Sequence, residues 1–266
     1  MTFWQAVILA IVEGITEYLP ISSTGHMVIT NALLGIQREP FAKAYIIIIQ
    51  FGAILSVVVL YWKRFLNFSN IKSAFDFYAK LLVAVVPAAV VGILLNSYID
   101  RLLGSPKMVA YALVVGGIFF LFVDKIFKQQ QGPDRPITWT MALGIGMFQT
   151  LALFPGVSRA AAVIIGGLAH GLNRKQAAEF SFFLAVPTLF AASVFDLRDN
   201  LHLITADHAL LLLVGMGISF VVAMLAIKAF IGYLARHGLM VFGWYRIALG
   251  GTILVLKKLG ISLTVV

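Results

Sequence analysis

The sequence predicts an all-α polytopic membrane protein that folds as a single membrane domain over residues 1–266. Apolar residues make up 61% of the chain and charged residues only 12%, whereas soluble domains contain about 25% charged residues. The mean hydropathy is +0.98. Several apolar runs are long enough to cross about 30 Å of hydrocarbon as helices. Together these observations exclude an ordinary soluble domain.

Six apolar runs are expected to be transmembrane helices, at residues 44–62, 80–98, 108–124, 177–196, 208–230 and 244–260. Two longer apolar stretches, 3–35 and 139–172, exceed one helix and are interrupted near the middle. Each interruption combines proline with small polar residues, at Pro20–Gly25 and Pro155–Arg159. Non-helical backbone survives at membrane depth only where protein or a watery cavity covers it. Each stretch is therefore expected to be a re-entrant helix–loop–helix that enters and leaves on one face.

The distribution of charged residues between the loops predicts which end of the molecule faces each side of the membrane. If both stretches are re-entrant and the chain begins outside, most loop cations fall on one side, which is expected to be cytoplasmic. The loop at 196–207, with three aspartates and one arginine, falls on the other side together with Lys257 and Lys258. The cations assigned to the cytoplasmic side are Lys63, Arg64, Lys72, Lys80, Lys125, Lys128, Arg135, Arg174, Lys175, Lys228 and Arg236.

The formal net charge of +9 does not indicate nucleic-acid binding. The basic residues occupy short loops between apolar runs, where they suit anionic lipid headgroups. Membrane lipids are therefore expected partners, and nucleic acid is not. Cysteine is absent, which excludes disulfides, thiolate catalysis and cysteine-based metal sites.

The two interrupted stretches suggest an internal repeat, with halves at about 1–124 and 125–266. Glu17–Ser23 aligns with Ala152–Ser158 at an offset of 135, which pairs the two prolines and pairs Ser23 with Ser158. Interrupted apolar segments at corresponding positions indicate a midplane binding site in an inverted-repeat fold.

Two carboxylates lie in the first apolar stretch. Glu13 and Glu17 are spaced i,i+4, so they share one face of a helix. Ionisable groups at this depth are costly and usually functional, and two adjacent carboxylates repel unless a cation or proton lies between them. A hard cation such as Mg²⁺ or Ca²⁺ meets that need. The alternative is a shallow helix whose carboxylates face headgroup water.

The first interruption predicts a phosphate site. Proline ends one half-helix and a serine or threonine caps the next, whose free N–H groups suit phosphate. His26 follows Ser22 and Ser23 by four and three residues, so either hydroxyl is expected to bond the imidazole, as an activated nucleophile requires. The alternative is that these hydroxyls only cap the helix.

The second interruption adds a cation. Arg159 at membrane depth needs an anionic partner, and its planar fork matches phosphate. The alternative is a structural salt bridge to Glu13 or Glu17. The two interpretations are compatible, because an empty site can hold the bridge and a bound one can exchange it for substrate.

These residues resemble a known family. Residues 13–26, EGITEYLPISSTGH, are similar to the first signature of the bacterial undecaprenyl pyrophosphate phosphatase family of the bacitracin-resistance type. Its second signature, Pro-Gly-x-Ser-Arg-Ser-Gly-x-Thr, is matched at Pro155, Gly156, Ser158 and Arg159. Similarity extends across the chain. The sequence departs from the second signature at 160–163, where Ala-Ala-Ala-Val removes two hydroxyls and is expected to weaken binding about tenfold.

The resemblance implies an enzyme that removes the terminal phosphate of undecaprenyl diphosphate at the outer face of the bacterial plasma membrane. This reaction recycles the lipid carrier for cell-wall synthesis. The resemblance also implies a divalent cation, Mg²⁺ or Ca²⁺, and an inverted-repeat fold with two re-entrant regions.

The expected mechanism assigns a role to each site residue. Glu13 and Glu17 hold the metal, while Ser23 is the nucleophile assisted by His26; water activated by Glu17 or His26 is the rival. Arg159 stabilises the charge of the transferring phosphoryl group. The residues expected to bind substrate are Ser22, Thr24, Gly25, Gly156, Ser158 and Arg159.

Other functions and assemblies are compatible with the same architecture. Inverted repeats with broken helices are also typical of transporters. A lipid flippase would use Glu13 and Glu17 as ion sites and Arg159 as a phosphate clamp. A further alternative is a phosphatase acting on another lipid phosphate. A homodimer is also compatible with the sequence.

Overall fold

The regular secondary structure of the described residues is entirely helical. The computed structural model describes residues 1–66, 71–95, 98–99, 102, 105–127 and 133–263. Six helices there are long and apolar enough to cross a membrane, as predicted. They are α3 (Pro40–Leu60), α5 (Ile71–Leu94), α7 (Pro106–Ile126), α10 (Arg174–Asn200), α11 (Ala209–Leu234) and α12 (Met240–Lys258).

The predicted spans and the observed helices differ mainly at one end. Helix α5 begins at Ile71, whereas the apolar run predicted a start at residue 80. Its first turns carry the charged residues Lys72, Asp76 and Lys80. An apolar run therefore could not predict this part of the helix. The last residues of that predicted span, 96–97, lie outside the described residues, as does Lys128 in a predicted basic loop.

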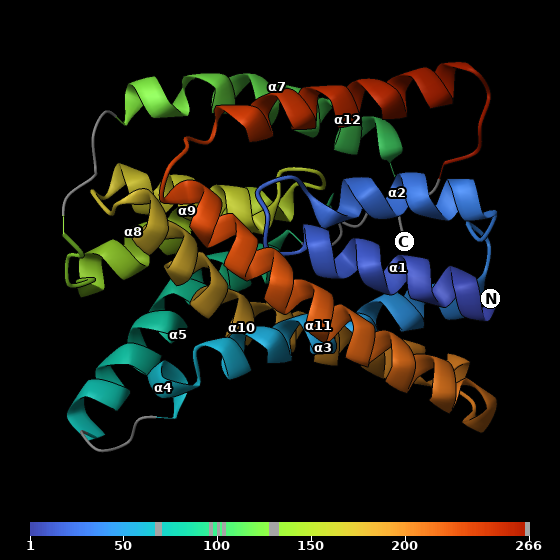
Figure 1. The fold of residues 1–266 in the computed structure, drawn as a ribbon, viewed down its shortest axis with the longest axis horizontal. Coiled ribbons are helices and arrows are strands. Elements are labelled where there is room, and N and C mark those ends of the chain that lie inside the picture. The colour runs from blue at the N-terminus through green and yellow to red at the C-terminus, as the bar shows by residue number, and fades with distance from the viewer. Residues whose placement is uncertain (67–70, 96–97, 100–101, 103–104, 128–132, 264–266) are drawn as a thin grey trace.

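The two interrupted stretches form pairs of short helices. The first pair is α1 (Phe3–Thr16) with α2 (Ser23–Leu34), and the second is α8 (Trp139–Gln149) with α9 (Arg159–Ala169). A 3-10 turn, η1 (Thr150–Leu153), extends α8. In each pair the helices pack against each other, and the connecting loops lie in the middle of the molecule (Figure 1). The breaks therefore fall where the prolines predicted them.

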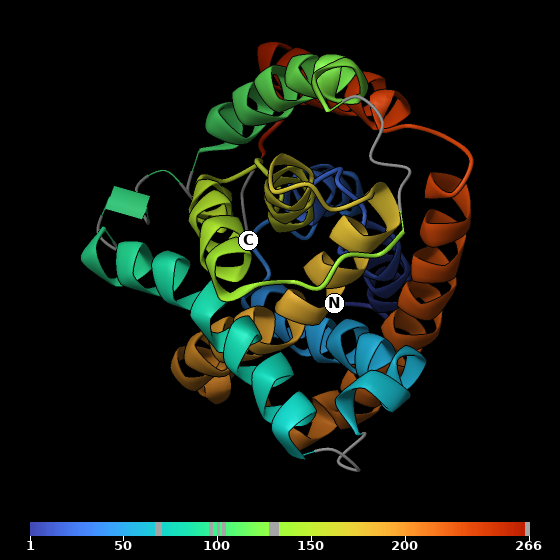
Figure 2. The ribbon, with the colours of Figure 1, turned by 90° about the vertical axis from the view of Figure 1, so that its left-hand side faces the viewer.

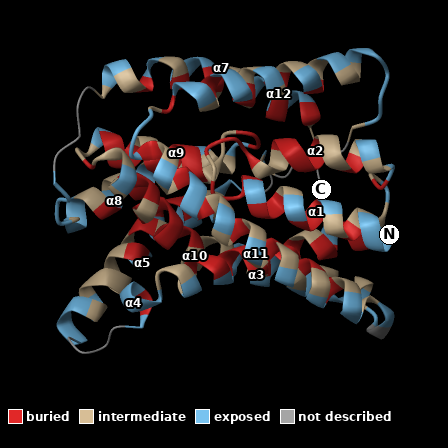
Figure 3. Cartoon of the chain, viewed as in Figure 1, coloured by how far each residue is buried: buried red, intermediate tan, exposed pale blue. Residues whose placement is uncertain are grey.

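Long helices surround these short ones. Viewed from one end, α9 and the pair α1–α2 lie inside an outer layer to which α5, α7, α11 and α12 contribute (Figure 2). Buried residues gather around the central loops and along α9 and α10, while α7 and α12 expose much of their surface (Figure 3). Large apolar side chains such as Val115 and Val255 are exposed there, as expected where a helix meets lipid.

Contacts between loops define the two ends of the molecule. At one end, Arg174 pairs with Asp124 at 2.8 Å, and the same carboxylate accepts a hydrogen bond from the backbone of Leu239 at 2.7 Å. At the other end, Gln37 donates to Ser262 and the ring of Phe41 stacks on His208. The first end carries most of the loop cations, and the second carries the N-terminus, Ser262 and the aspartate-rich loop. This arrangement agrees with the charge-based topology.

The short helices of each predicted half pack against long helices of the other half. Helix α1 packs against α11, and the corresponding helix α8 packs against α5. Equivalent helices also meet directly, since α3 contacts α10 and α7 contacts α12. A two-fold inverted repeat requires such matching contacts between its halves. The repeat itself, with its boundary near residue 124, stays a prediction.

Candidate active site

Each central loop ends in a serine with an unusual backbone. Ser22 and Ser158 have φ values of 69° and 75°, a left-handed conformation that is uncommon for residues other than glycine. The Ser22 hydroxyl accepts from the Gly25 N–H and the Ser158 hydroxyl from the Ala161 N–H. Both hydroxyls therefore cap helices, and both helix N-termini begin at the centre of the fold.

The two caps correct the alignment of the halves. Ser158 follows Ser22 by 136 residues, whereas the prolines are 135 apart and the sequence alignment paired Ser158 with Ser23. The second loop has one residue more between its proline and its cap. Ser23 therefore corresponds to Arg159, and the two loops present different side chains at the first position of equivalent helices.

Glu17 connects the two loops. Its Oε1 accepts from Nη2 of Arg159 at 3.2 Å, and its Oε2 accepts from the hydroxyl of Ser23 at 2.8 Å. The side chains of Arg159 and Glu17 are only 9% and 5% exposed. Of the two carboxylates that the sequence offered for a salt bridge, Glu17 is the one that Arg159 contacts.

The Arg159 guanidinium is held from several sides. Nη1 donates to the carbonyl of Ser181 at 2.7 Å and to its hydroxyl at 3.2 Å, and the Tyr18 ring centroid lies 5.6 Å from the guanidinium carbon. Nε is buried without a hydrogen-bond partner. These contacts fix the guanidinium at the end of the second loop. There its hydrogen bond to Glu17 can be replaced by one to a phosphate.

Glu13 lies one turn before Glu17 and is 1% exposed. Its carboxylate faces Glu17 and the amide of Gln50, and its Oε1 is buried without a hydrogen-bond partner. This burial contradicts the alternative in which the carboxylates face headgroup water.

The residues present fit a magnesium or calcium ion. No group of three or more His, Cys, Asp or Glu side chains able to hold a metal occurs among the described residues. Magnesium is commonly held by one or two carboxylates with substrate phosphates and water completing its shell. The unpartnered oxygen of Glu13 beside Glu17 supplies that donor set.

His26 does not bond either serine hydroxyl, contrary to the sequence prediction. Its Nδ1 lies 2.8 Å from the carbonyl oxygen of Ser22, and its Nε2 lies 2.7 Å from the hydroxyl of Tyr245. The two rings also stack. The reason is the cap geometry: the Ser22 hydroxyl is used by the Gly25 N–H, and the Ser23 hydroxyl points to Glu17.

Sequence reasoning missed Arg246, a fully buried cation on α12. Its Nη1 donates to the carbonyls of Pro20 and Val157 at 3.1 and 3.0 Å, so one group joins both loops. Nη2 donates to the carbonyls of Gly156 and Ala112. No carboxylate pairs with it among the described residues. An arginine within a predicted span was the available signal.

The remaining predicted residues shape the loops. Gly156 has a φ of +92°, and a Cβ there would lie 2.5 Å from the Val109 carbonyl oxygen, so the loop requires glycine. A Cβ at Gly25 would lie 2.8 Å from Leu113. Thr24 is half-buried in the first turn of α2.

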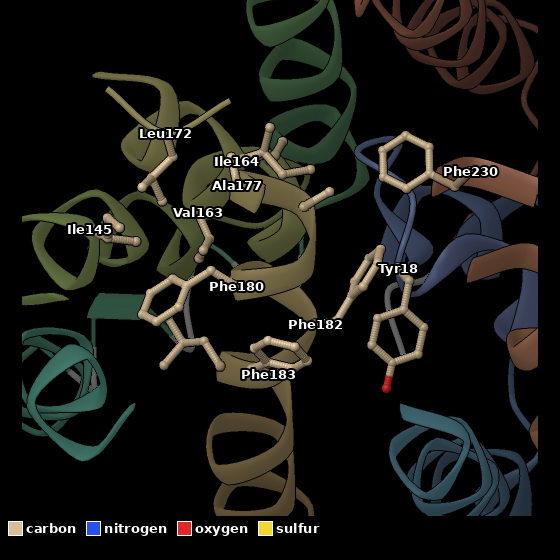
Figure 4. Close-up of a cluster of buried hydrophobic side chains, with 14 of the residues drawn as sticks. Tyr18, Ile145, Val163, Ile164, Leu172, Ala177, Phe180, Phe182, Phe183 and Phe230 are labelled. Atoms are coloured by element: carbon tan, nitrogen blue, oxygen red, sulfur yellow. The ribbon is translucent and has the colours of Figure 1, made fainter. Parts of the chain in front are cut away.

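The positions that depart from the family signature are buried. Ala160, Ala161 and Ala162 are at most 3% exposed, and Val163 is fully buried. Val163 belongs to the main apolar cluster and lies among its side chains near Phe180 (Figure 4). A hydroxyl at 163 would therefore enter an apolar cluster.

These contacts bring together groups that suit an anion and place a hydroxyl beside them. Two helix N-termini offer backbone N–H groups and the positive end of a dipole, and Arg159 adds a planar fork suited to phosphate. Ser23 lies beside a carboxylate that can accept its proton. Such a set is suited to phosphoryl transfer, in which positioning and charge stabilisation supply most of the catalysis.

Comparison with known proteins gives a consistent result. The model of the family described as bacitracin resistance protein BacA matches residues 6–252. Curated proteins named Undecaprenyl-diphosphatase from Porphyromonas gingivalis and Bdellovibrio bacteriovorus are each 48% identical to this chain, with all of both chains covered. One from Flavobacterium psychrophilum is 50% identical over 96% of both chains.

Proposed function

The chain belongs to the bacitracin resistance protein BacA family, and from that membership and the site geometry we propose that it is an undecaprenyl-diphosphatase. It hydrolyses undecaprenyl diphosphate to undecaprenyl phosphate and inorganic phosphate, which recycles the lipid carrier for peptidoglycan synthesis and supports bacitracin resistance. The observation that carries the proposal is the contact of Glu17 with both Arg159 and Ser23, because it places a phosphate clamp, a base and a nucleophile together.

The terminal phosphate binds between the N-termini of α2 and α9. Arg159 exchanges its contact with Glu17 for phosphate oxygens, while Ser181 continues to hold the guanidinium. The freed carboxylate of Glu17 then accepts the proton of the attacking hydroxyl. Arg246 keeps both loops at a fixed separation through their carbonyl groups, so the two N-termini stay aimed at one point.

The Ser23 hydroxyl is the favoured nucleophile, and Glu17 replaces His26 as its base. Ser23 Oγ attacks the terminal phosphorus, its proton passes to Glu17, and the bond from phosphorus to the bridging oxygen breaks to release undecaprenyl phosphate. Water then attacks the phosphoserine, which restores the serine and releases phosphate. In the rival path, Glu17 deprotonates a water that attacks the phosphorus directly.

Glu13 and Glu17 would hold the divalent cation, Mg²⁺ or Ca²⁺. Such an ion neutralises phosphate charge and orients the reacting groups. Glu13 is the better placed of the two, because its free oxygen is buried while both oxygens of Glu17 already accept hydrogen bonds.

An apolar groove beside the first loop suits the prenyl chain. It runs between α1, α11 and α12, and its lining includes Ile15, Leu19, Leu225, Phe230 and Phe242. Leu19 lies between Glu17 and Pro20 in the chain, so the groove adjoins the site. The prenyl tail lies along this groove and continues into lipid.

The protein is a multi-pass membrane protein, and its orientation is part of the proposal. In the bacterial plasma membrane, the end with the loop cations faces the cytoplasm. The outer face as the side that the site serves comes from the family resemblance. Nothing favours the lipid-transporter alternative, and the relatives reported above are named as diphosphatases. The homodimer and the absence of a nucleic-acid partner stay predictions.

The test is phosphate release from a C55 or C15 prenyl diphosphate by detergent-purified protein, with and without EDTA. Arg159→Ala should abolish release. The matched control is Arg174→Ala, which removes an arginine paired with Asp124 at the far end of the molecule and should leave release near normal. If the folded wild type releases no phosphate, or Arg159→Ala retains normal release, the proposed function is wrong.

A further inference from the structure

A cavity of about 230 Å³ lies at the end of the molecule that carries the loop cations. Its walls come from α4 (Trp62–Phe65), the first turns of α5, the segment before α8 and the start of α10. It does not include any residue of the two central loops. The volume corresponds to several water molecules at about 30 Å³ each, or to one phosphate group with part of its substituent.

The charged side chains that line this cavity are mostly cations. Its cations are Lys63, Arg64, Lys80 and Arg135, and its carboxylate is Asp76. Asp76 pairs with Lys80, which leaves three cations in excess. Two further carboxylates lie nearby without lining the cavity. Glu179 faces Arg64 and also pairs with Lys175, and Asp134 accepts from Asn173.

Two of these cations are held by contacts of their side chains, and a third is held through its backbone. The Lys80 side chain is 16% exposed, with its ammonium 5.7 Å from the ring centroid of Trp139. Arg64 lies 5.4 Å from the ring centroid of Phe77. The backbone of Arg135 exchanges two hydrogen bonds with the Gln176 side chain. Cations ordered before binding lose less entropy when an anion arrives, unlike lysines that extend freely into headgroups.

Helix α10 separates the cavity from the catalytic arginine. Phe180 and Phe183 line the cavity, while Ser181 between them accepts the hydrogen bonds of Arg159. Figure 4 shows Phe182 beside Tyr18, with Phe180 on the opposite side of the helix. The cavity is therefore a separate site, and one of its walls is α10, the helix that also carries Ser181 and so holds Arg159.

We propose that this cavity binds the phosphate group of an anionic ligand. Phosphate is the class that its chemistry selects, because residues with guanidinium and ammonium groups line a small space, and such groups form charge-assisted hydrogen bonds with phosphate oxygens. The group comes from an anionic lipid headgroup or from soluble phosphate. The proposal does not depend on the reaction assigned to the central loops.

The test measures binding of two probes to the full-length purified protein. One probe is radiolabelled inorganic phosphate in equilibrium dialysis. The other is phosphatidylglycerol retained after reconstitution into vesicles of phosphatidylcholine with or without phosphatidylglycerol. The test variant is Lys63→Ala with Arg135→Ala. The matched control, Lys72→Ala with Arg236→Ala, removes one lysine and one arginine from the same end without touching the cavity.

The cavity variant should bind at least one probe about tenfold more weakly for each cation lost, and the control should bind like the wild type. Loss of phosphate binding identifies a soluble ligand, and loss of phosphatidylglycerol retention alone identifies a headgroup. Repeating both pairs in an Arg159→Ala background separates this site from the central one. Lys63→Gln with Arg135→Gln serves if the alanine pair does not fold. Equal binding by cavity and control variants would overturn the proposal.

Discussion

The Ser23 hydroxyl lies 2.8 Å from Oε2 of Glu17, and this contact joins the start of α2 to the carboxylate that follows α1. The carboxylate is also held by Arg159 at 3.2 Å. A carboxylate, a hydroxyl and a guanidinium therefore meet at one largely buried point. His26 lies to the side, bonded to the Ser22 carbonyl and to Tyr245.

Ser23→Ala should lower turnover by at least about 10³-fold, because it removes the nucleophile of a covalent path. The measurement is single-turnover phosphate release, with mass spectrometry of the quenched wild type to detect phosphoserine at residue 23. Ser56→Ala is the control, since that buried hydroxyl donates to the carbonyl of Ala53, three residues before it. Substantial turnover by Ser23→Ala would favour water activated by Glu17.

Glu17→Gln should cost more turnover than His26→Gln. Glutamine at 17 still bonds Ser23 but cannot take its proton, and general-base catalysis contributes about 10²–10⁴-fold. Glutamine at 26 can still reach the Ser22 carbonyl, so this substitution should change only the position of the first loop. Both variants are compared by kcat at saturating substrate. The opposite ranking would return the role of base to His26.

Arg159→Lys should fail to rescue activity even though it keeps the charge. Lysine cannot reproduce the planar fork that contacts Glu17 and Ser181 together. Loss of one preorganised charge contact costs about 10²–10³-fold in kcat. The measurement is kcat for Arg159→Lys beside Arg159→Ala. Near-normal turnover by the lysine variant would mean that the charge alone suffices.

Gly116→Ala should disturb the site without changing any charge. A Cβ at Gly116 would lie 2.4 Å from Nη2 of Arg246, so the guanidinium must leave the carbonyls that it joins. Each such charge-assisted bond contributes about 1.5–3 kcal/mol, and both thermal stability in detergent and turnover should fall. Gly232→Ala is the control, because nothing lies within 4 Å of that Cβ. Equal behaviour of the two variants would show that Arg246 does not hold the loops together.

Glu13→Gln should raise the Mg²⁺ concentration that gives half-maximal activity. The substitution keeps the shape of the side chain but removes one of two carboxylates available to the cation. The measurement is a metal titration after EDTA treatment. The control is Glu39→Gln, which removes a carboxylate that pairs with the N-terminal amine of Met1. An unchanged titration curve for Glu13→Gln would exclude Glu13 as a ligand.

The sequence determined the parts that depend on local pattern. Apolar runs predicted the six long helices, and prolines followed by small polar residues predicted both breaks. The i,i+4 spacing placed Glu13 and Glu17 on one face, and depth in an apolar segment predicted an anionic partner for Arg159, which is Glu17. Each of these inferences spans a few turns of helix, within which backbone geometry relates residues directly.

Only the tertiary structure decided which groups meet. Arg159 reaches Glu17 across 142 residues, His26 reaches Tyr245 across 219, and Arg246 reaches Pro20 across 226. Helical spacing allowed His26 to bond a serine, but the left-handed cap at Ser22 turned both hydroxyls elsewhere. Helical spacing limits which side chains can share a face, whereas long-range packing selects among the partners that remain.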